Sequence, residues 1–410
     1  MKLIKVFLFL ILSNFAVSQN NWPSVSWNNS INLTSTMASS GIDEASGLYW
    51  NKDTNRLYLV QNSGRVRILQ YDATTNSFSQ IGNKSISGGP EGITMANNSE
   101  NAFYTIDENN YEIRKYTHTT DFSTVTKTKS WNLLASPSTM TDTGNTGPEG
   151  ICFIPDSYLT SSNFISQMTG LPYVSQKGMG GLFFVAHQDA GYIWVFDVNA
   201  NTNDDFAFIG KYKTNREESC DLSFDASTGL LYILHNIDGN LLEATALSST
   251  VVGSNRKLNM VNEYFLPVPS GNTNIEGFAI TDKCSQGNTI SAWLCRDASS
   301  SESTSILTDT LRWFSPFSSD GNCLPLSNNA TEIEENLVIF PNPATSKITI
   351  HELENSHSEI TIYSSLGTIM YSEKATKSIY DIDISNFSSG IYFVILKDGS
   401  TIKKSRFIKL

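Results

Sequence analysis

Short apolar runs separated by polar, turn-forming residues occupy much of the chain. Two stretches, 44–62 and 218–236, align without a gap: each opens on Glu, continues as an apolar run, turns, and ends a second apolar run at Asn. Three further stretches begin with Glu-Gly and an apolar residue, at Glu91, Glu149 and Glu276. Each copy predicts a strand, a hairpin and a second strand. Repeats of this length made of short strands are typical of β-propeller blades.

The pattern predicts an all-β fold but leaves the number of blades open. Five copies of the repeat are visible, and residues 24–35 supply one further strand-like segment. An N-terminal strand of this kind can pair with the last blade and close the ring. We favour six blades, and five or seven are also compatible with the pattern. The alternative fold is an irregular β-sandwich.

The first 18 residues have the pattern of a secretory signal peptide. Lys2 and Lys5 provide positive charge, residues 6–12 are apolar, and Ala16 and Ser18 provide small residues before a cleavage site. The apolar run is too short to span a bilayer, which needs about 20 residues. We therefore expect removal of the signal before Gln19 and no transmembrane segment in the mature chain.

The end of the chain reads as a separate small β-sandwich. A polar linker at 326–335 precedes strand-like runs and turns over 336–410. The motifs at 340–345, 362–367 and 389–394 resemble the type A C-terminal sorting domain of the bacterial type IX secretion system. The resemblance implies binding to that secretion machinery, passage through the periplasm, and a final location in the medium or on the outer cell surface. The alternative is a carbohydrate-binding module.

These boundaries divide the chain into four parts: a signal peptide (1–18), a propeller domain (19–325), a linker (326–335) and a sorting domain (336–410). Composition then narrows the partners. Lys and Arg number 28 against 40 Asp and Glu, so the net charge is -12. Nucleic-acid binding is excluded because phosphate contacts need clustered Lys and Arg. We expect a monomer that binds an extracellular glycan, peptide or small molecule.

The propeller region resembles a family as well. The Glu-x-Ser-Gly-Leu motif at 44–48 and the Pro-Glu-Gly-Ile motifs at 90–93 and 148–151 resemble the SdiA-regulated and phytase-like β-propellers. That resemblance implies an acidic central channel able to hold Ca²⁺, and phosphoesterase activity in some relatives.

The repeat also aligns acidic residues. Glu91, Glu149 and Glu276 share one position, and Glu44 and Glu218 fall two residues earlier, which in a strand is the same face. Close carboxylates repel unless they are protonated or neutralised, and Ca²⁺ accepts six to eight oxygen ligands. The predicted Ca²⁺ ring is Glu44, Glu91, Glu149, Glu218, Glu276 and Asp107. Alternatively, each Glu caps backbone N–H groups at the turn of its own blade.

Three residues at the ends of second strands are candidate catalytic groups. His187 and His235 occupy equivalent places and could act as general bases or ligands. Arg296 could bind an anionic group or pair with a channel carboxylate. Alternatively, each is a polar residue that closes a strand end. The chain lacks a Gly-x-Ser-x-Gly elbow, a phosphate-binding P-loop and a His-Glu-x-x-His motif.

These features favour a non-catalytic binding protein with a ligand or Ca²⁺ at an acidic channel. The first alternative is a Ca²⁺-dependent phosphoesterase or esterase that uses metal-bound water. Sparse Lys and Arg near the acids weigh against a phytase-type activity. A polysaccharide lyase is a third possibility that would require His187, His235 and Arg296 to converge.

Cysteine usage agrees with export, because oxidising compartments permit disulfides. The chain has five cysteines. Two of Cys284, Cys295 and Cys323 are expected to pair, while Cys152 and Cys220 on first strands are expected to be buried thiols.

Overall fold

The computed structural model describes residues 20–410 with internal gaps at 238–239, 269–272, 285–289, 325–338, 352–358, 365–367, 375–378 and 399–400. The predicted signal peptide and linker lie outside the described residues. The chain divides into two compact units, Met1–Leu324 and Pro325–Leu410.

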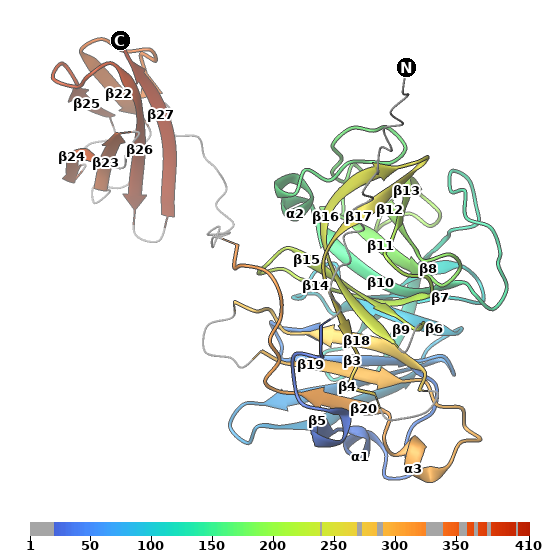
Figure 1. Cartoon of the computed structure of the whole chain (residues 1–410). Coiled ribbons are helices and arrows are strands. Elements are labelled where there is room, and N and C mark those ends of the chain that lie inside the picture. The colour runs from blue at the N-terminus through green and yellow to red at the C-terminus, as the bar shows by residue number, and fades with distance from the viewer. Residues whose placement is uncertain are drawn as a thin grey trace, which may run out of the picture. The chain divides into compact units, whose positions relative to one another are not determined.

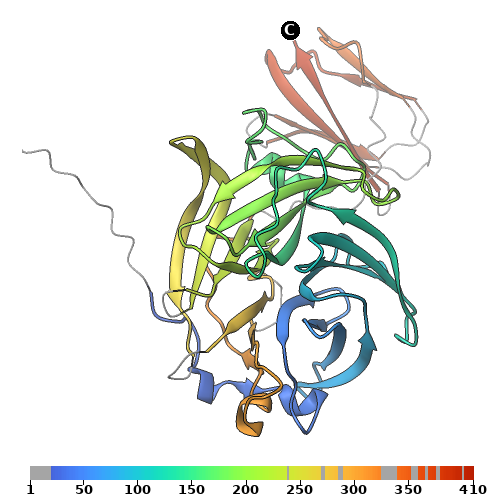
Figure 2. The same cartoon turned by 90° about the vertical axis from the view of Figure 1, so that its right-hand side faces the viewer.

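The first unit is a β-propeller of five four-stranded antiparallel sheets around a common axis (Figures 1 and 2). From the axis outward, the first three blades are β2 (Ala45–Asn51), β3 (Arg56–Gln61), β4 (Arg65–Asp72), β5 (Ser77–Ser85); β6 (Pro90–Thr94), β7 (Ala102–Asp107), β8 (Glu112–His118), β9 (Val125–Asn132); and β10 (Pro148–Pro155), β11 (Gly181–His187), β12 (Tyr192–Val198), β13 (Phe206–Lys213). The last two are β14 (Ser219–Asp225), β15 (Leu230–His235), β16 (Leu241–Val252), β17 (Asn255–Phe265); and β18 (Ile275–Ile280), β19 (Ala292–Arg296), β20 (Leu311–Phe314), β1 (Ile31–Asn32).

The propeller prediction is confirmed, with five blades in the described residues rather than the favoured six. The reason is that the N-terminal segment does not belong to an additional blade. Its strand β1 is the outer strand of blade 5 and pairs antiparallel with β20, with Ile31 opposite Trp313. The predicted closure of the ring by this segment is therefore confirmed.

Three short helices, α1 (Thr34–Met37), α2 (Asp156–Ser161) and α3 (Thr304–Leu307), and one 3-10 turn, η1 (Trp27–Asn29), connect these strands. Blades 3 and 4 are also joined at their outer edges, where β13 and β17 run parallel and Tyr212 lies opposite Arg256. No helix among the described residues is both long and apolar enough to cross a membrane.

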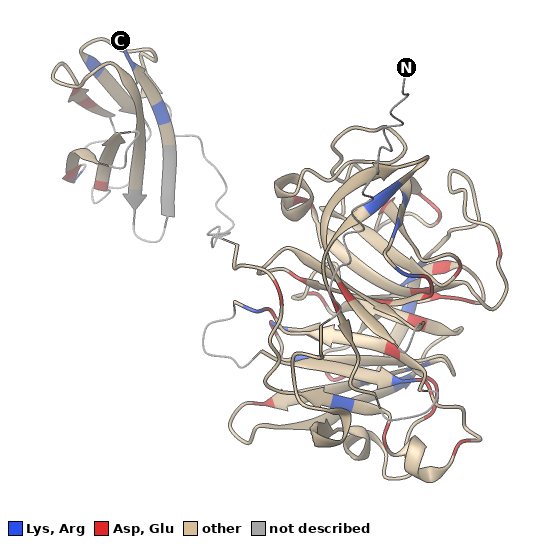
Figure 3. Cartoon of the chain, viewed as in Figure 1, with Lys and Arg blue, Asp and Glu red and all other residues tan. Residues whose placement is uncertain are grey.

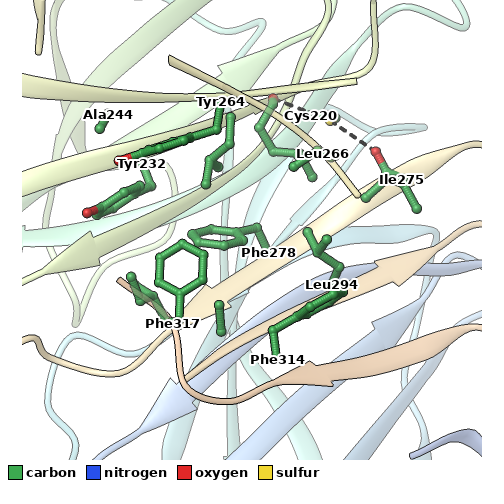
Figure 4. Close-up of a cluster of buried hydrophobic side chains, with 14 of the residues drawn as sticks. Cys220, Tyr232, Ala244, Tyr264, Leu266, Ile275, Phe278, Leu294, Phe314 and Phe317 are labelled. Carbon is green, nitrogen blue, oxygen red and sulfur yellow. Dashed lines mark hydrogen bonds between the residues drawn. The ribbon is translucent and has the colours of Figure 1, made fainter. Parts of the chain in front are cut away.

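The apolar residues of each blade face those of the next blade. Between blades 4 and 5, Tyr232 and Leu234 of β15 pack against Phe278, Leu294 and Phe314 of blade 5 (Figure 4). All five side chains are buried. Burial of this kind is the main favourable term in folding and fixes each blade against its neighbours. It thereby positions the inner strands around the axis.

Cysteine pairing follows the expectation that two of three candidates join. Cys284, after β18, forms a disulfide with Cys323, after β20. Cys295 is a buried thiol on β19, and Cys152 and Cys220 are buried thiols on inner strands.

The second unit has two small antiparallel sheets. One is β21 (Ile339–Phe340), β22 (Lys347–His351) and β25 (Ile379–Asp383); the other is β24 (Ile369–Lys374), β23 (Glu359–Ser364), β26 (Gly390–Asp398) and β27 (Thr401–Lys409). Ile348, Ile362, Val394 and Phe407 form a shared core between the sheets. The small C-terminal β-sandwich is therefore confirmed.

Candidate functional site

The inner strands of the five blades meet at one repeat position. It is Gly47, Gly92, Gly150 and Gly277 in four blades and Asp221 in blade 4. A Cβ added to Gly92 would lie 2.7–2.9 Å from backbone atoms of the next inner strand. At Gly277 it would lie 2.4 Å from the Ser46 oxygen. The strands therefore touch backbone to backbone here, which requires glycine at these positions.

Asp221 fills the centre of this narrow ring. Its Oδ2 accepts hydrogen bonds from the backbone N–H of Phe278 (2.8 Å) and of Leu48 (3.3 Å), and its Oδ1 from that of Leu222 (2.8 Å). The side chain is fully buried. Burial raises the pKa of Asp221 well above its ordinary value, although the three donors act in the opposite direction. The Asp221 ring separates the two ends of the axis.

Three of the predicted glutamates gather at the end where the inner strands begin. Glu91, Glu149 and Glu276 each precede the ring glycine of their blade. Burial raises the pKa of Glu91 to about 8, with further contributions from the charges of Glu108 and Asp297. Burial, followed by repulsion from Glu91 and Glu276, raises the pKa of Glu149 well above its ordinary value. Several acidic positions appear in red on the right-hand side of the propeller in Figure 3.

Glu276 belongs to the same group of mutually repelling acids. Burial raises its pKa well above the ordinary value, followed by repulsion from Asp297 and Glu91. Asn274 holds it in place, because Asn274 Nδ2 donates to Glu276 Oε1 (2.6 Å) and to Asp297 Oδ2 (3.1 Å). These contacts bring carboxylates of blades 2, 3 and 5 to one end of the axis.

A second set of oxygen-bearing side chains surrounds these acids. Each residue directly follows a second strand: Asn62, Glu108, Gln188, Asn236 and Asp297. Glu108 Oε1 accepts a hydrogen bond from Gly147 N (3.3 Å), and burial raises the pKa of Glu108. Together with Glu91, Glu149 and Glu276, these five residues form what we term the acidic mouth.

Three oxygens of the acidic mouth are buried without a hydrogen-bond partner. They are Glu91 Oε1, Gln188 Oε1 and Asp297 Oδ1. The Glu91 side chain is nearly inaccessible, at 3 % exposure. Buried polar atoms in native proteins are almost always satisfied by a protein group, water or an ion. The acidic mouth therefore presents acceptors without donors, the arrangement that a cation satisfies.

The structure does not bring Asp107 to the acidic mouth. Asp107 is fully buried inside blade 2, where Arg114 Nη1 lies 2.5 Å from its Oδ2 and Asn110 N donates to its Oδ1. Asp107 lies opposite Pro90, just as His235 lies opposite Ser219. Its neighbour Glu108 is therefore the equivalent of Asn236. A shift of one residue along a strand reverses the face of a side chain.

Glu44 and Glu218 lie at the rim and are only partly buried. Both have left-handed backbones, with φ of 47° and 52°. Their carbonyls accept hydrogen bonds from Asn62 N and Asn236 N, which closes the turn of each blade. Burial, then Asp43 and Asp297, raises the pKa of Glu44. These contacts favour the blade-architecture alternative for this pair.

The three candidate catalytic residues do not converge. His187 Nδ1 contacts Asp189 N at 3.2 Å, and burial lowers the pKa of His187 to about 4. His235 is fully buried, with Nε2 at 3.2 Å from Glu243 Oε2. Arg296 Nη2 donates to Ile306 O at 3.1 Å. Each makes its contacts away from the acidic mouth, which favours the role of a polar strand end.

Sequence reasoning missed Glu108, Asp221 and Asp297 as members of the site. Asp221 carried a readable signal, because it is the one non-glycine at the ring position of the repeat. Among the described residues, no three His, Cys, Asp or Glu side chains stand close enough to hold a metal ion without moving. Amide oxygens such as Gln188 Oε1 would have to complete any such site.

Comparison with known proteins identifies the C-terminal unit. Residues 338–410 match the family model of the secretion system C-terminal sorting domain. No curated protein matches the chain.

Solved structures similar to this chain include a Lactobacillus plantarum protein, with 15% identity over 56% of this chain and 57% of that chain, and a TM-score of 0.33. They also include PorZ of Porphyromonas gingivalis, a surface component of the type IX secretion system, with 13% identity over 88% and 59% and a TM-score of 0.29. The chain thus spans less than two thirds of the length of either protein. Given its C-terminal match, the chain is a β-propeller protein that the type IX secretion system exports to the outer surface or the medium.

Proposed function

We propose that the exported propeller is a calcium-dependent binding module whose acidic mouth holds Ca²⁺. The observation that carries the proposal is the Glu91 carboxylate, which is buried with Oε1 unpartnered while Glu149 and Glu276 raise the local negative charge. Without a cation these acids avoid repulsion only by holding protons, as their raised pKa values indicate.

The chemistry of the donors favours a hard cation. Carboxylate and amide oxygens surround the mouth, and Ca²⁺ takes six to eight oxygen ligands in flexible geometry. Zn²⁺ would favour His or Cys ligands. His187 and His235 contact groups inside their blades, and the Cys220 thiol contacts the carbonyl oxygens of Leu234 and Ile275. Binding would draw the carboxylates together and require Gln188 or Asn62 to contribute amide oxygens.

No observation favours the hydrolase or lyase alternatives. A metal-dependent hydrolase would place a general base beside the ion. The ring of His187 is buried against Trp194 and Tyr111, and His235 pairs with Glu243. We therefore propose a binding role and no reaction.

Calcium titration of the exported chain tests the proposal. Isothermal titration calorimetry at pH 8 with CaCl₂ should show binding, and Ca²⁺ should raise Tm. Glu91→Gln and Glu149→Gln should each weaken binding by about tenfold or more, a loss of about 1.4 kcal/mol. Glu100→Gln is the control, since Glu100 is exposed on the turn between β6 and β7.

The pH of the titration provides a second criterion. At about pH 5 protons compete with Ca²⁺ for the raised carboxyls, so binding should weaken relative to pH 8. Absence of binding at both pH values, or equal binding by wild type and both variants, would refute the proposal.

A further inference from the structure

A second feature lies at the opposite end of the inner strands from the acidic mouth. A cavity of about 450 Å³, which we term the aromatic cavity, lies between blade 1 and blade 5. Its size falls in the range of small-molecule binding pockets. The aromatic side chains that line it are Trp50, Tyr71, Phe78, Trp293 and Trp313.

These rings form a fixed wall. Trp50 stacks on Trp293 with ring centres 4.9 Å apart and planes inclined by 20°. Phe78 meets Trp313 edge to face at 5.3 Å. Trp293 and Trp313 lie directly opposite each other on β19 and β20. Rings held on paired strands keep a constant orientation, which lowers the entropic cost of binding a ligand.

Two donors in this wall have no acceptor. The indole N–H groups of Trp293 and Trp313 are buried and make no hydrogen bond. A buried unsatisfied donor costs about 1–3 kcal/mol, so two in one wall are an unusual expense. A ligand with acceptor oxygens would offset this cost.

The remaining lining is polar but nearly uncharged. Asn55, Asn76, Thr281 and Ser315 contribute amides and hydroxyls. Tyr71 donates to Asn76 Oδ1 at 2.9 Å, which leaves the Asn76 amide N–H groups for a ligand. This lining would leave a purely apolar ligand with unpaired polar groups around it.

Charge in the cavity is largely neutralised. Lys52 Nζ lies 2.6 Å from Asp282 Oδ2, across from blade 1 to blade 5. Asp53 is the other charged residue in the lining. A strongly ionic ligand would therefore find no opposing cluster of charge.

The aromatic cavity continues toward the propeller axis. A second cavity of about 280 Å³ lies at this end of the axis, lined by residues of all five blades such as Tyr49, Phe153 and Phe224. Trp50 and Lys52 border both cavities. A ligand longer than one ring could occupy both, with Trp50 at the junction.

We propose that the two adjoining cavities bind a neutral oligosaccharide, with one sugar ring against Trp50. The C–H faces of a sugar ring pack on aromatic faces, and its hydroxyls both donate and accept hydrogen bonds. Those properties match a wall of aromatic rings with unpaired indole N–H groups beside neutral amides and hydroxyls. The site is separate from the acidic mouth and does not depend on Ca²⁺ there.

The test uses the exported chain and neutral trisaccharides of glucose, mannose, xylose and N-acetylglucosamine. Calorimetry and tryptophan fluorescence should show binding of at least one trisaccharide. Trp50→Ala should weaken that binding by about tenfold or more. Tyr192→Ala is the control, because Tyr192 is an aromatic residue of blade 3 outside both cavities.

Two milder variants keep the test decisive if Trp50→Ala fails to fold. Asn55 and Asn76 have left-handed backbones with φ of 53° and 50°, which glycine adopts without strain. Asn55→Gly and Asn76→Gly therefore remove the amides alone, and each should weaken binding severalfold. The proposal is overturned if no trisaccharide binds at about 10 mM, if binding survives all three substitutions, or if uncharged tripeptides bind in place of the sugars.

Discussion

The carboxylate of Asp221 accepts a 2.8 Å hydrogen bond from the backbone N–H of Phe278, 57 residues further along the chain. The same oxygen contacts the N–H of Leu48 at 3.3 Å, on the inner strand of blade 1. One side chain thus ties the inner strands of blades 4, 5 and 1 at the centre of the propeller. Where four blades use glycine to approach closely, the fifth supplies the acceptor for the donors that this approach buries.

Asp221→Ala should strongly destabilise the propeller. The substitution leaves the N–H groups of Leu48 and Phe278 buried without an acceptor, at a combined cost of about 2–5 kcal/mol. Asp221→Asn keeps an acceptor oxygen and should cost less. Urea unfolding measures both, with Asp142→Ala as control because Asp142 is exposed. Equal stability of the Ala and Asn variants would contradict this role.

The acidic mouth should make stability depend on pH in the absence of a cation. Burial and neighbouring acids raise the pKa of Glu91 from 4.5 to about 8. The folded protein then holds a proton that the unfolded chain loses above about pH 4.5. This contribution to stability is fully present below that pH and is lost as pH rises through about 8.

Glu91→Gln isolates this contribution from that of the other acids. The fall in the free energy of unfolding between about pH 5 and pH 8 should be smaller in the variant than in wild type. Chemical unfolding in EDTA at both pH values provides the measurement, and Glu100→Gln should retain the wild-type slope. Identical slopes for all three proteins would show that Glu91 titrates normally.

The repeat made much of the fold predictable from the sequence. The inner strands begin at Ala45, Pro90, Pro148, Ser219 and Ile275, each within one residue of a repeat glutamate. Local alternation and turn residues suffice to place such strands. The blade count was not accessible in this way, because pairing of residues 31–32 with β20 depends on contacts between the two ends of the propeller.

The site was less predictable because every inner strand carries a register shift beside the repeat glycine. A bulge inserts an extra residue and breaks the alternation of faces. The expectation that Glu44 and Glu218 share the face of Glu91 rested on that alternation. The choice of Asp107 over Glu108 failed for a related reason, since one residue of register separates the blade interior from the axis.

The Cys284–Cys323 disulfide should contribute substantially to stability. It closes a loop with a sequence separation of 39 residues, for which the chain-entropy model gives about 3–4 kcal/mol. The double variant Cys284→Ser, Cys323→Ser should lose up to that amount in chemical unfolding. Reductant should lower the stability of wild type and leave the double variant unchanged, because the other three cysteines are free thiols. A reductant effect on the variant would show that another group is responsible.

Closure of the ring should depend on the packing of Trp27 more than on the side chains of β1. Trp27 is 1% exposed, packs near Phe314, and donates from Nε1 to Asp309 Oδ2 at 3.0 Å. Trp27→Ala should therefore cost about 3–5 kcal/mol through the cavity it leaves. Ile31→Ala is the matched control, since the Ile31 side chain is 47% exposed while its backbone still pairs with Trp313.

Limited proteolysis would show where the Trp27→Ala variant opens. If the N-terminal segment closes the propeller, cleavage should appear first in residues 20–40 and then in blade 5, with blades 2 and 3 protected longest. The Ile31→Ala control should resist cleavage like wild type, because its backbone pairing and core packing are intact. Equal stability of the two variants, or first cleavage within blade 2, would mean that the ring holds together without its N-terminal strand.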